Sequence, residues 1–386
     1  MANLRKFAVV IYILLVYSGL IKWIPGLPID LTLVFTVLLL AIFPFLFKPH
    51  FTAYSSFGKT IVFSVLGISI LFLLSNAYTI SSNYALSKSI ATVLNMFCFL
   101  YPLLLFEKED IPYFKKVMWV GNIIILLVLS YFYFTDQFIY FQMSEKTIES
   151  VIGFAIPNYL SIGTFISASL IFQIDNKSIF NRLITLYSVF ILFVLGGRGP
   201  LIFLFFIFIL HYFLTLEVKK FSFKNVIIIL LGLMMFLQYF DFSAIDFNRY
   251  NVLENFNEDE SATERLYYFE KGYQSVTNHL LTGLGIGSSG MILSDSDISL
   301  YPHNLFLESL MEIGIVGGFM YLFLYIILFF KVFTRVSNLP LFCLGLISLY
   351  LFFQDMKSGS FDSWRISLMW ISLFIIQYHQ SEKIEI

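Results

Sequence analysis

The sequence predicts an all-α protein that crosses a membrane about twelve times and carries one long polar loop. Composition is the first observation, since 59% of the 386 residues are hydrophobic and only 13% are charged, whereas soluble proteins are about one quarter charged. So few charges cannot cover a globule in water, so lipid must be the solvent for most of the surface. The mean hydropathy of +0.84 agrees. The net charge of −1 argues against a nucleic-acid partner.

Runs of apolar residues are the second observation, because about 20 such residues in a helix cross the hydrocarbon core. The N-terminus resembles a signal peptide but lacks a clear cleavage site before Pro25, so we expect an uncleaved first span. The spans define helices 1–9 in residues 1–240, a loop at 241–302, and helices 10–12 with a short tail in 303–386. The predicted spans are 7–24, 29–47, 60–79, 90–106, 117–135, 150–173, 183–197, 200–216, 225–240, 303–330, 340–354 and 365–379.

The distribution of basic residues predicts how these spans are oriented. With the N-terminus inside, cytoplasmic segments hold 15 of the 24 Lys and Arg residues and external segments hold the other 9. Three of the nine lie in the long loop, where the positive-inside rule does not apply, so the comparison is 15 against 6. Both termini are therefore predicted to be cytoplasmic, and the loop 241–302 is predicted to be external and, in a bacterium, periplasmic.

A turn is predicted inside the apolar stretch 183–216. As one helix this stretch would be roughly 50 Å long, which exceeds a hydrocarbon core of about 30 Å. Gly196, Gly197 and Gly199 supply the break, and Pro200 suits the first turn of the next helix. Arg198 then lies near the external surface, where a cation usually has a partner or a substrate. The alternative is an arginine that reaches the interface from a helix end without further role.

The long loop is predicted to contain a helix that carries Arg265. The sequence from Ser261 to Glu264 is a capping-box pattern, which marks a helix start. An apolar stripe follows at helical spacing, so we expect the helix to lie against the spans or the membrane surface, with Arg265 at the edge of the stripe. A solvated Arg265 is the alternative. The stripe comprises Leu266, Phe269, Tyr273, Val276 and Leu280.

His303 is predicted to open the span that follows the loop. An imidazole at the water–lipid boundary titrates near neutrality and can accept a proton from a sugar hydroxyl. Asn304, Glu308 and Glu312 follow at helical spacing, and the two glutamates orient the helix, bond to neighbouring spans or act as a base. An interfacial His303 with no role is the alternative. Near the last spans, Arg365 is predicted to face the same external cavity.

Other patterns give weaker signals. Asp295 and Asp297 form a D-x-D pattern, but this is common by chance in a polar loop, and we expect no metal and no cofactor. The glycines of the G-x-G-x-G sequence that begins at Gly283 follow a helix rather than a strand, so they indicate a helix stop. Cys98 and Cys343 fall inside apolar runs and are expected to be free core thiols.

Four features together resemble the O-antigen polymerase and O-antigen ligase superfamily of bacterial envelope enzymes. They are Gly153 with Pro157-Asn158 at the start of a span, the Gly-Arg-Gly turn at Arg198, and Arg265 with its helix and the following Gly-x-Gly. The most specific is His303-Asn304-x-x-Leu307-x-x-x-x-Glu312-x-Gly314. The resemblance covers about residues 150–330. The family often has proline before the glycine pair, where this chain has Leu281-Thr282.

The resemblance implies a metal-independent glycosyltransferase at the outer face of the bacterial cytoplasmic (inner) membrane. The donor would be a polyprenyl-diphosphate-linked oligosaccharide, and the polymer an O-antigen or a capsular polysaccharide. Arg198 and Arg265 would hold the diphosphate in forked hydrogen bonds, and His303 would deprotonate the acceptor. Partners would include membrane lipid, a flippase and a chain-length regulator. The residues expected to bind substrate are Asn158, Asn304, Glu312 and Arg365.

Other functions stay open at this point. A ligase would transfer finished polymer to the lipid A core, and an oligosaccharyltransferase would use a protein acceptor. Motifs do not separate these from a polymerase, which we favour. A transporter of lipid-linked sugars is the alternative from another class. Transporters tend to keep ionisable groups at mid-bilayer in related halves, whereas here the charges gather at one predicted face and no halves repeat.

Overall fold

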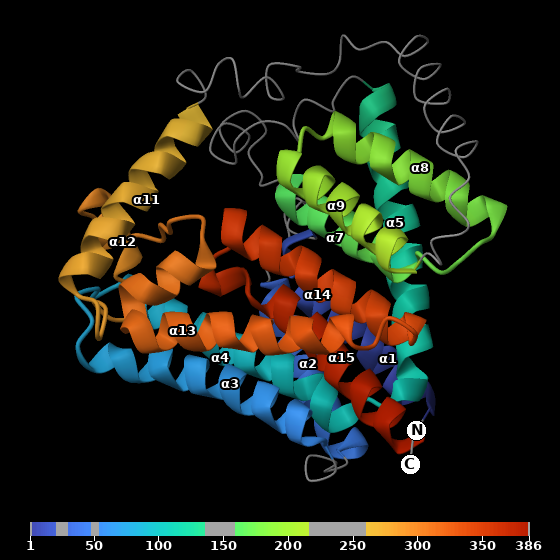
Figure 1. Ribbon diagram of the computed structural model, residues 1–386, viewed down its shortest axis with the longest axis horizontal. Coiled ribbons are helices and arrows are strands. Elements are labelled where there is room, and N and C mark those ends of the chain that lie inside the picture. The colour runs from blue at the N-terminus through green and yellow to red at the C-terminus, as the bar shows by residue number, and fades with distance from the viewer. Residues whose placement is uncertain (1, 21–29, 48–53, 136–158, 216–259, 385–386) are drawn as a thin grey trace.

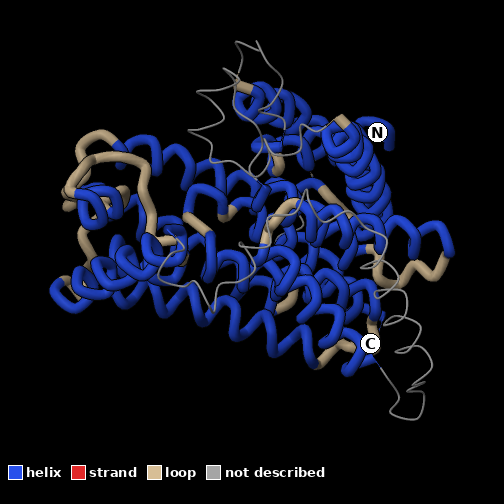
Figure 2. The backbone as a smooth tube through the Cα atoms, turned by 90° about the horizontal axis from the view of Figure 1, so that it is seen from above, coloured by secondary structure: helices blue, strands red, loops and turns tan. Residues whose placement is uncertain are grey.

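The computed structural model describes residues 2–20, 30–47, 54–135, 159–215 and 260–384. Within these ranges the chain consists of helices joined by loops, and it contains no strand (Figure 2). The predicted all-α class is therefore confirmed. Both cysteines are buried and free, as predicted.

Eleven helices correspond to eleven of the twelve predicted spans, and the remaining span, 225–240, lies outside the described residues. Six helices are long and apolar enough to cross a membrane. They are α3 with η3 (Ser56–Leu74, Ser75–Ala77), α4 (Tyr84–Leu105), η4 with α5 (Lys108–Asp110, Ile111–Phe134), α9 (Arg198–Thr215), α13 (Leu305–Phe333) and α14 (Leu339–Ser358). The helices that correspond to the other predicted spans are α1 (Ala2–Val16), followed by η1 (Ser18–Leu20), and α2 (Leu31–Leu46), α7 (Tyr159–Phe172), α8 (Ile179–Val194) and α15 (Arg365–Ile384).

The break between α8 and α9 lies where the sequence predicts it. Gly196 takes a φ of 69°, in the left-handed region that glycine reaches at low cost, and the chain reverses there. Arg198 is the first residue of α9 rather than part of the preceding turn. Gly163 of α7 lets α7 and α9 approach closely, because a Cβ there would lie 2.8 Å from the Pro200 ring of α9.

Several helices begin at polar caps that the sequence places just before apolar runs. Ser55, Ser178 and Asn304 each accept a hydrogen bond from a backbone N–H in the first turn of α3, α8 and α13. The cap at Asn304 means that α13 begins at Leu305. His303 therefore precedes the span instead of opening it.

The helix ends that adjoin the predicted external loops lie together at one end of the molecule. Long helices such as α3, α4 and α13 run side by side, and α11 (Glu260–Asn278) and α12 (Ser289–Ser294) cover one end of them (Figure 1). Contacts between distant segments tie this end together. The Tyr78 hydroxyl donates to the Thr282 carbonyl at 2.8 Å, and the Phe361 N–H donates to Glu308 at 2.9 Å. The start of α1 and the end of α15 lie at the opposite end of the long axis (Figure 1).

Candidate functional site

His303 is held in an unusual backbone conformation between two aromatic rings. Its φ is 55°, and Asp295 is the only other non-glycine residue with positive φ in the described ranges. This conformation costs about 1–2 kcal/mol for an ordinary residue, and such strain often marks a functional position. The imidazole stacks on Tyr268 of α11 at 6.4 Å between centroids and meets the ring of Tyr301 at 4.7 Å. These two rings fix its orientation.

The electrostatic surroundings keep His303 neutral. Burial, and then the positive charge of Arg265, lower the pKa of His303 to about 4, and Glu264 offsets part of this effect. A neutral imidazole is the form that accepts a proton. The buried Nδ1 atom has no hydrogen-bond partner among the described residues. Since buried polar atoms are normally paired, this nitrogen is a proton acceptor that the described residues leave unused.

We expect His303 to react with diethyl pyrocarbonate, which modifies neutral imidazole, down to a lower pH than an ordinary histidine. Its reactivity should change little between about pH 8 and about pH 5, whereas a group with a pKa of about 6.5 loses most of its neutral form there. The loss should be centred near pH 4, because His303 has its pKa lowered to about 4. Mass spectrometry of the modified peptide measures the rate at each pH.

The variant Arg265→Met provides the matched comparison for this measurement. It removes a positive charge that lowers the pKa of His303, so the midpoint of the reactivity curve should move to higher pH. A midpoint near 6.5 in the unsubstituted protein, or no change in the variant, would contradict the assigned environment.

Arg265 lies on the face of α11 that packs on α13, but four of the five residues of the predicted apolar stripe do not. The side of α11 that contacts α13 includes Gly272, where a Cβ would lie 2.9 Å from the Met311 sulfur. Of the stripe residues, Val276 is buried and the other four are exposed. The prediction that the stripe packs on the spans is therefore wrong for those four. Contact of the stripe with the membrane surface, the other predicted placement, stays a prediction.

Arg198 and Arg265 are connected through a third basic residue, Lys357, in the last turn of α14. A Cβ added to Gly199 would lie 2.9 Å from the Lys357 Nζ atom, so this ammonium group packs over the first turn of α9. The positive charges of Arg265 and Arg198 both act on Lys357. Below, Arg198, Arg265 and Lys357 are called the cationic cluster. Through Arg265 the cluster reaches His303.

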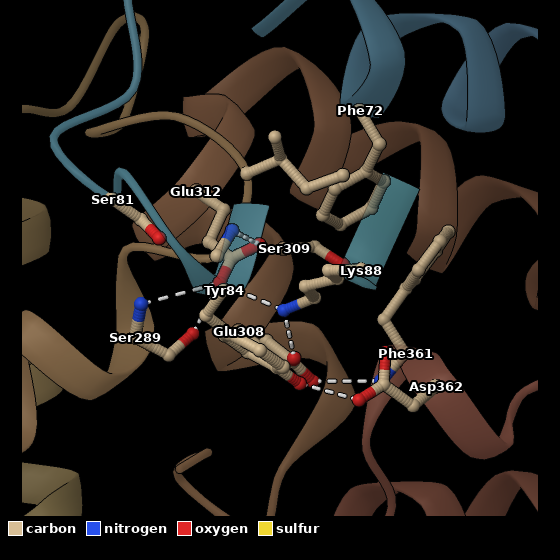
Figure 3. Close-up of polar contacts among 12 residues, drawn as sticks. Phe72, Ser81, Tyr84, Lys88, Ser289, Glu308, Ser309, Glu312, Phe361 and Asp362 are labelled. Atoms are coloured by element: carbon tan, nitrogen blue, oxygen red, sulfur yellow. Dashed lines mark hydrogen bonds and ion pairs between the residues drawn. The ribbon is translucent and has the colours of Figure 1, made fainter. Parts of the chain in front are cut away.

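Beneath the site, a buried ion triad holds α13 to α4 (Figure 3). Lys88 of α4 pairs with Glu308, and its Nζ atom lies 2.7 Å from Glu312 Oε1. All three side chains are at most 1% exposed. Glu308 also accepts from the Phe361 N–H at 2.9 Å. The prediction that the glutamates bond to a neighbouring span is therefore confirmed.

Glu312 also anchors the loop after α11. Its carboxylate accepts from the Ser289 N–H at 3.3 Å and from the Ser289 hydroxyl (Figure 3). It also accepts from the Gly287 N–H at 3.1 Å. Two residues later, Gly314 takes φ 69° and ψ −166°, which breaks the regular backbone of α13. The Ile315 N–H then donates to the Leu280 carbonyl at 2.8 Å. The Glu312-x-Gly314 pattern thus joins α13 to the loop.

The glycines of the G-x-G-x-G sequence do more than stop a helix. Gly283, Gly285 and Gly287 all have positive φ, and each lies against the backbone of another segment. A Cβ on Gly285 would lie 2.3 Å from the Thr79 Cα atom, and one on Gly283 would lie 2.5 Å from a backbone atom of Glu312. These close approaches fit the loop between the start of α4 and the break in α13.

We expect Gly285→Ala to lower the stability of the protein clearly. The backbone at this φ of 90° costs about 1–3 kcal/mol for a residue with a side chain, and overlap with backbone atoms adds to this. Thermal unfolding of the purified protein in detergent measures the effect. Gly19→Ala is the control, since nothing lies within 4 Å of a Cβ there. Equal unfolding temperatures for the two variants would contradict the proposed packing.

The D-x-D pattern has a structural use in the described residues. The Asp297 carboxylate accepts hydrogen bonds from the hydroxyl of Ser81 at 2.6 Å and from the N–H groups of Asn83 and Tyr84, at 2.6 and 3.2 Å. These hydrogen bonds hold the pKa of Asp297 well below its usual range. Asp297 therefore caps the start of α4.

The remaining predicted site residues occupy different positions. Asn304 caps α13 through its side-chain oxygen, 2.9 Å from the Leu307 N–H. Arg365 donates to the Val16 carbonyl at 3.1 Å and to Ser18 at 3.2 Å, which ties α15 to the end of α1. Asn158 lies outside the described residues. Substrate contacts by these residues and by Glu312 stay predictions.

Four residues of this region were missed by reasoning from the sequence: Tyr268, Tyr301, Lys88 and Lys357. Tyr268 lies one helical turn after Arg265, a spacing that places both on one face. Lys88 was assigned to an external segment because the span was expected to begin at residue 90, whereas α4 begins at Tyr84. The pairing of Lys88 and the position of Lys357 depend on contacts between segments far apart in the sequence.

The fold and the site together define a multi-pass, all-α membrane protein with basic residues and an imidazole gathered at one end of its helices. The comparison with protein families agrees. Residues 183–322 match the family model described as O-antigen ligase. This match confirms the resemblance to the O-antigen polymerase and ligase superfamily and indicates a role in lipopolysaccharide assembly. A search among curated proteins gives no match.

Proposed function

We propose that this protein is a metal-independent glycosyltransferase that polymerises polyprenyl-diphosphate-linked oligosaccharide repeat units into O-antigen or capsular polysaccharide. It would act at the outer face of the bacterial inner membrane, beside the flippase and chain-length regulator of the same pathway. The observation that carries the proposal is the position of Arg265, which lies in electrostatic reach of both His303 and Lys357, the latter beside Arg198.

The reaction requires stabilisation of the leaving group. In the reaction, an acceptor hydroxyl forms a bond to the anomeric carbon of the donor, and the bond from that carbon to the diphosphate breaks. The electron pair of that bond leaves with the diphosphate, which gains negative charge. Arginine donates forked, charge-assisted hydrogen bonds to phosphate oxygens, and each such bond is worth about 1.5–3 kcal/mol. Arg198 and Arg265 would supply this stabilisation.

The second requirement is a base for the acceptor hydroxyl. His303 is neutral and its Nδ1 atom has no partner among the described residues, so it can take the proton. The charge of Arg265 is one reason why the pKa of His303 is low. A diphosphate bound to Arg265 offsets that charge, so the bound donor would raise the pKa of His303. The base would thus become stronger when the donor is in place.

A ligase that transfers polymer to the lipid A core is the second candidate. The matching family is described as O-antigen ligase, which favours this candidate, and a ligase uses the same donor chemistry. The two candidates differ only in their acceptor.

One reconstitution tests both candidates. The purified full-length protein is placed in nanodiscs with lipid-linked repeat units, with and without lipid A core, and without added metal. Polymer that forms from repeat units alone supports the polymerase, and product that appears only with the lipid A core supports the ligase. If neither product forms while the lipid-linked units are carried across a vesicle membrane, the transporter alternative replaces both.

A further inference from the structure

The side chain of Lys357 occupies a place that a glycine at a helix start leaves open. Gly199 has no side chain, and the Lys357 Nζ and Cδ atoms lie 2.9 and 3.3 Å from where its Cβ would be. The same small volume contains the first turn of α9, whose N-terminal end carries partial positive charge. The ammonium group is therefore held beside Arg198 and the positive end of a helix.

This arrangement is electrostatically unfavourable for the ammonium group of Lys357. Arg265 and Arg198 both act on Lys357 with like charge, and no carboxylate of the described residues is among the groups that act on it. The acidic side chains nearest in sequence are engaged elsewhere. Asp355 accepts from Ser367 at 2.6 Å, and Asp362 accepts from the Tyr84 hydroxyl.

A position at the C-terminal end of α14 does not explain the arrangement by itself. A lysine in the last turn is favoured by the helix dipole, but that effect is equally available to a side chain that points to solvent. Lys357 instead packs on Gly199, towards two other cations. Like charges held close together favour binding of a polyanion.

We propose that Lys357 is a third ligand of the donor's diphosphate, which it holds between Arg198 and Arg265. This inference rests on the proposed function, because it assigns a further contact to the same leaving group. Two arginines grip phosphate oxygens in forked pairs, and the lysine adds a compact point charge with three donors. Together the cationic cluster offers up to three positive charges to the diphosphate.

The test measures direct binding of farnesyl diphosphate, a short polyprenyl diphosphate, to the full-length protein in nanodiscs. Lys357→Cys removes the ammonium group, and treatment with 2-bromoethylamine then restores an amine of similar length. The native thiols do not interfere, because Cys98 and Cys343 are buried. Lys271→Cys on α11, with the same treatment, is the matched control, since its Nζ lies over the Tyr267 ring. Farnesol and inorganic pyrophosphate separate binding of the chain from binding of the diphosphate.

We expect Lys357→Cys to weaken farnesyl diphosphate binding about 10-fold or more, because one charge-assisted contact is lost. Aminoethylation should restore most of the affinity, farnesol should bind unchanged, and Lys271→Cys should bind as the unsubstituted protein does. If the protein recognises the headgroup alone, binding of inorganic pyrophosphate should fall by the same factor as binding of farnesyl diphosphate.

Two results would overturn the role of Lys357 and leave the proposed function standing. The first is tight binding by Lys357→Cys while Arg198→Ala binds weakly. The second is weak binding that aminoethylation does not restore, which would indicate a packing role for Lys357. If the unsubstituted protein binds no farnesyl diphosphate, the diphosphate grip of the proposed function fails, and this inference fails with it.

Discussion

His303→Asn is expected to lower the rate of sugar transfer by about 10²–10⁴-fold, the usual contribution of a general base. Asparagine is the informative replacement because it tolerates the left-handed backbone that His303 adopts with φ 55°. Alanine at this position would add backbone strain to the loss of the imidazole. The measurement is the initial rate of product formation in nanodiscs, with unfolding temperature recorded in parallel.

The control for this variant is His303→Gly, which relieves the backbone strain and also removes the imidazole. Both variants should be folded and both should be slow. A His303→Asn protein with normal rates would remove His303 from the mechanism. A protein that unfolds early and is slow in proportion would point to a structural role instead.

Lys88→Met is expected to cause the largest loss of stability among substitutions in the buried triad. It leaves Glu308 and Glu312 close together, both essentially without exposure and without the cation between them. Removing one partner of a buried ion pair costs about 3–5 kcal/mol. The expected result is a large fall in the unfolding temperature of the purified protein, or failure to accumulate in the membrane.

Comparison with Glu308→Gln separates charge from packing. That variant keeps Lys88 paired with Glu312 and removes the excess negative charge, so its effect should be clearly smaller than that of Lys88→Met. Lys271→Met, outside the triad, should have little effect. If Glu308→Gln is as damaging as Lys88→Met, the balance of charges is not what stabilises the contact between α4 and α13.

Hydropathy alone located most of this fold, because the cost of leaving backbone groups unpaired in lipid forces each long apolar run to be a helix. The turn at Gly196 could likewise be read from chain length and glycine content. Helix starts were less accurate. α4 begins at Tyr84 because the carboxylate of Asp297, from a distant loop, caps it, and no local pattern contains that information.

The candidate site was only partly visible in the sequence. His303, Arg265 and Arg198 were selected by residue type, expected position at a membrane boundary and resemblance. Their motif partners have clear physical roles in the structure, since Asn304 caps α13 and Gly314 breaks it. Four of the five residues of the apolar stripe on α11 do not pack on the spans, which was one of the two predicted placements, because helical periodicity identifies an apolar face but not the surface that the face contacts.

The sequence by itself determined that this chain is a bundle of membrane helices with a polar, basic and imidazole-bearing segment near its C-terminal third. Only the tertiary structure decided that Lys357 joins the two arginines, that Lys88 is buried between two glutamates, and that His303 lies between two tyrosines. The reason is physical. Solvent preference and helix formation act over short stretches of chain, whereas the pairing of charges depends on which distant segments meet in space.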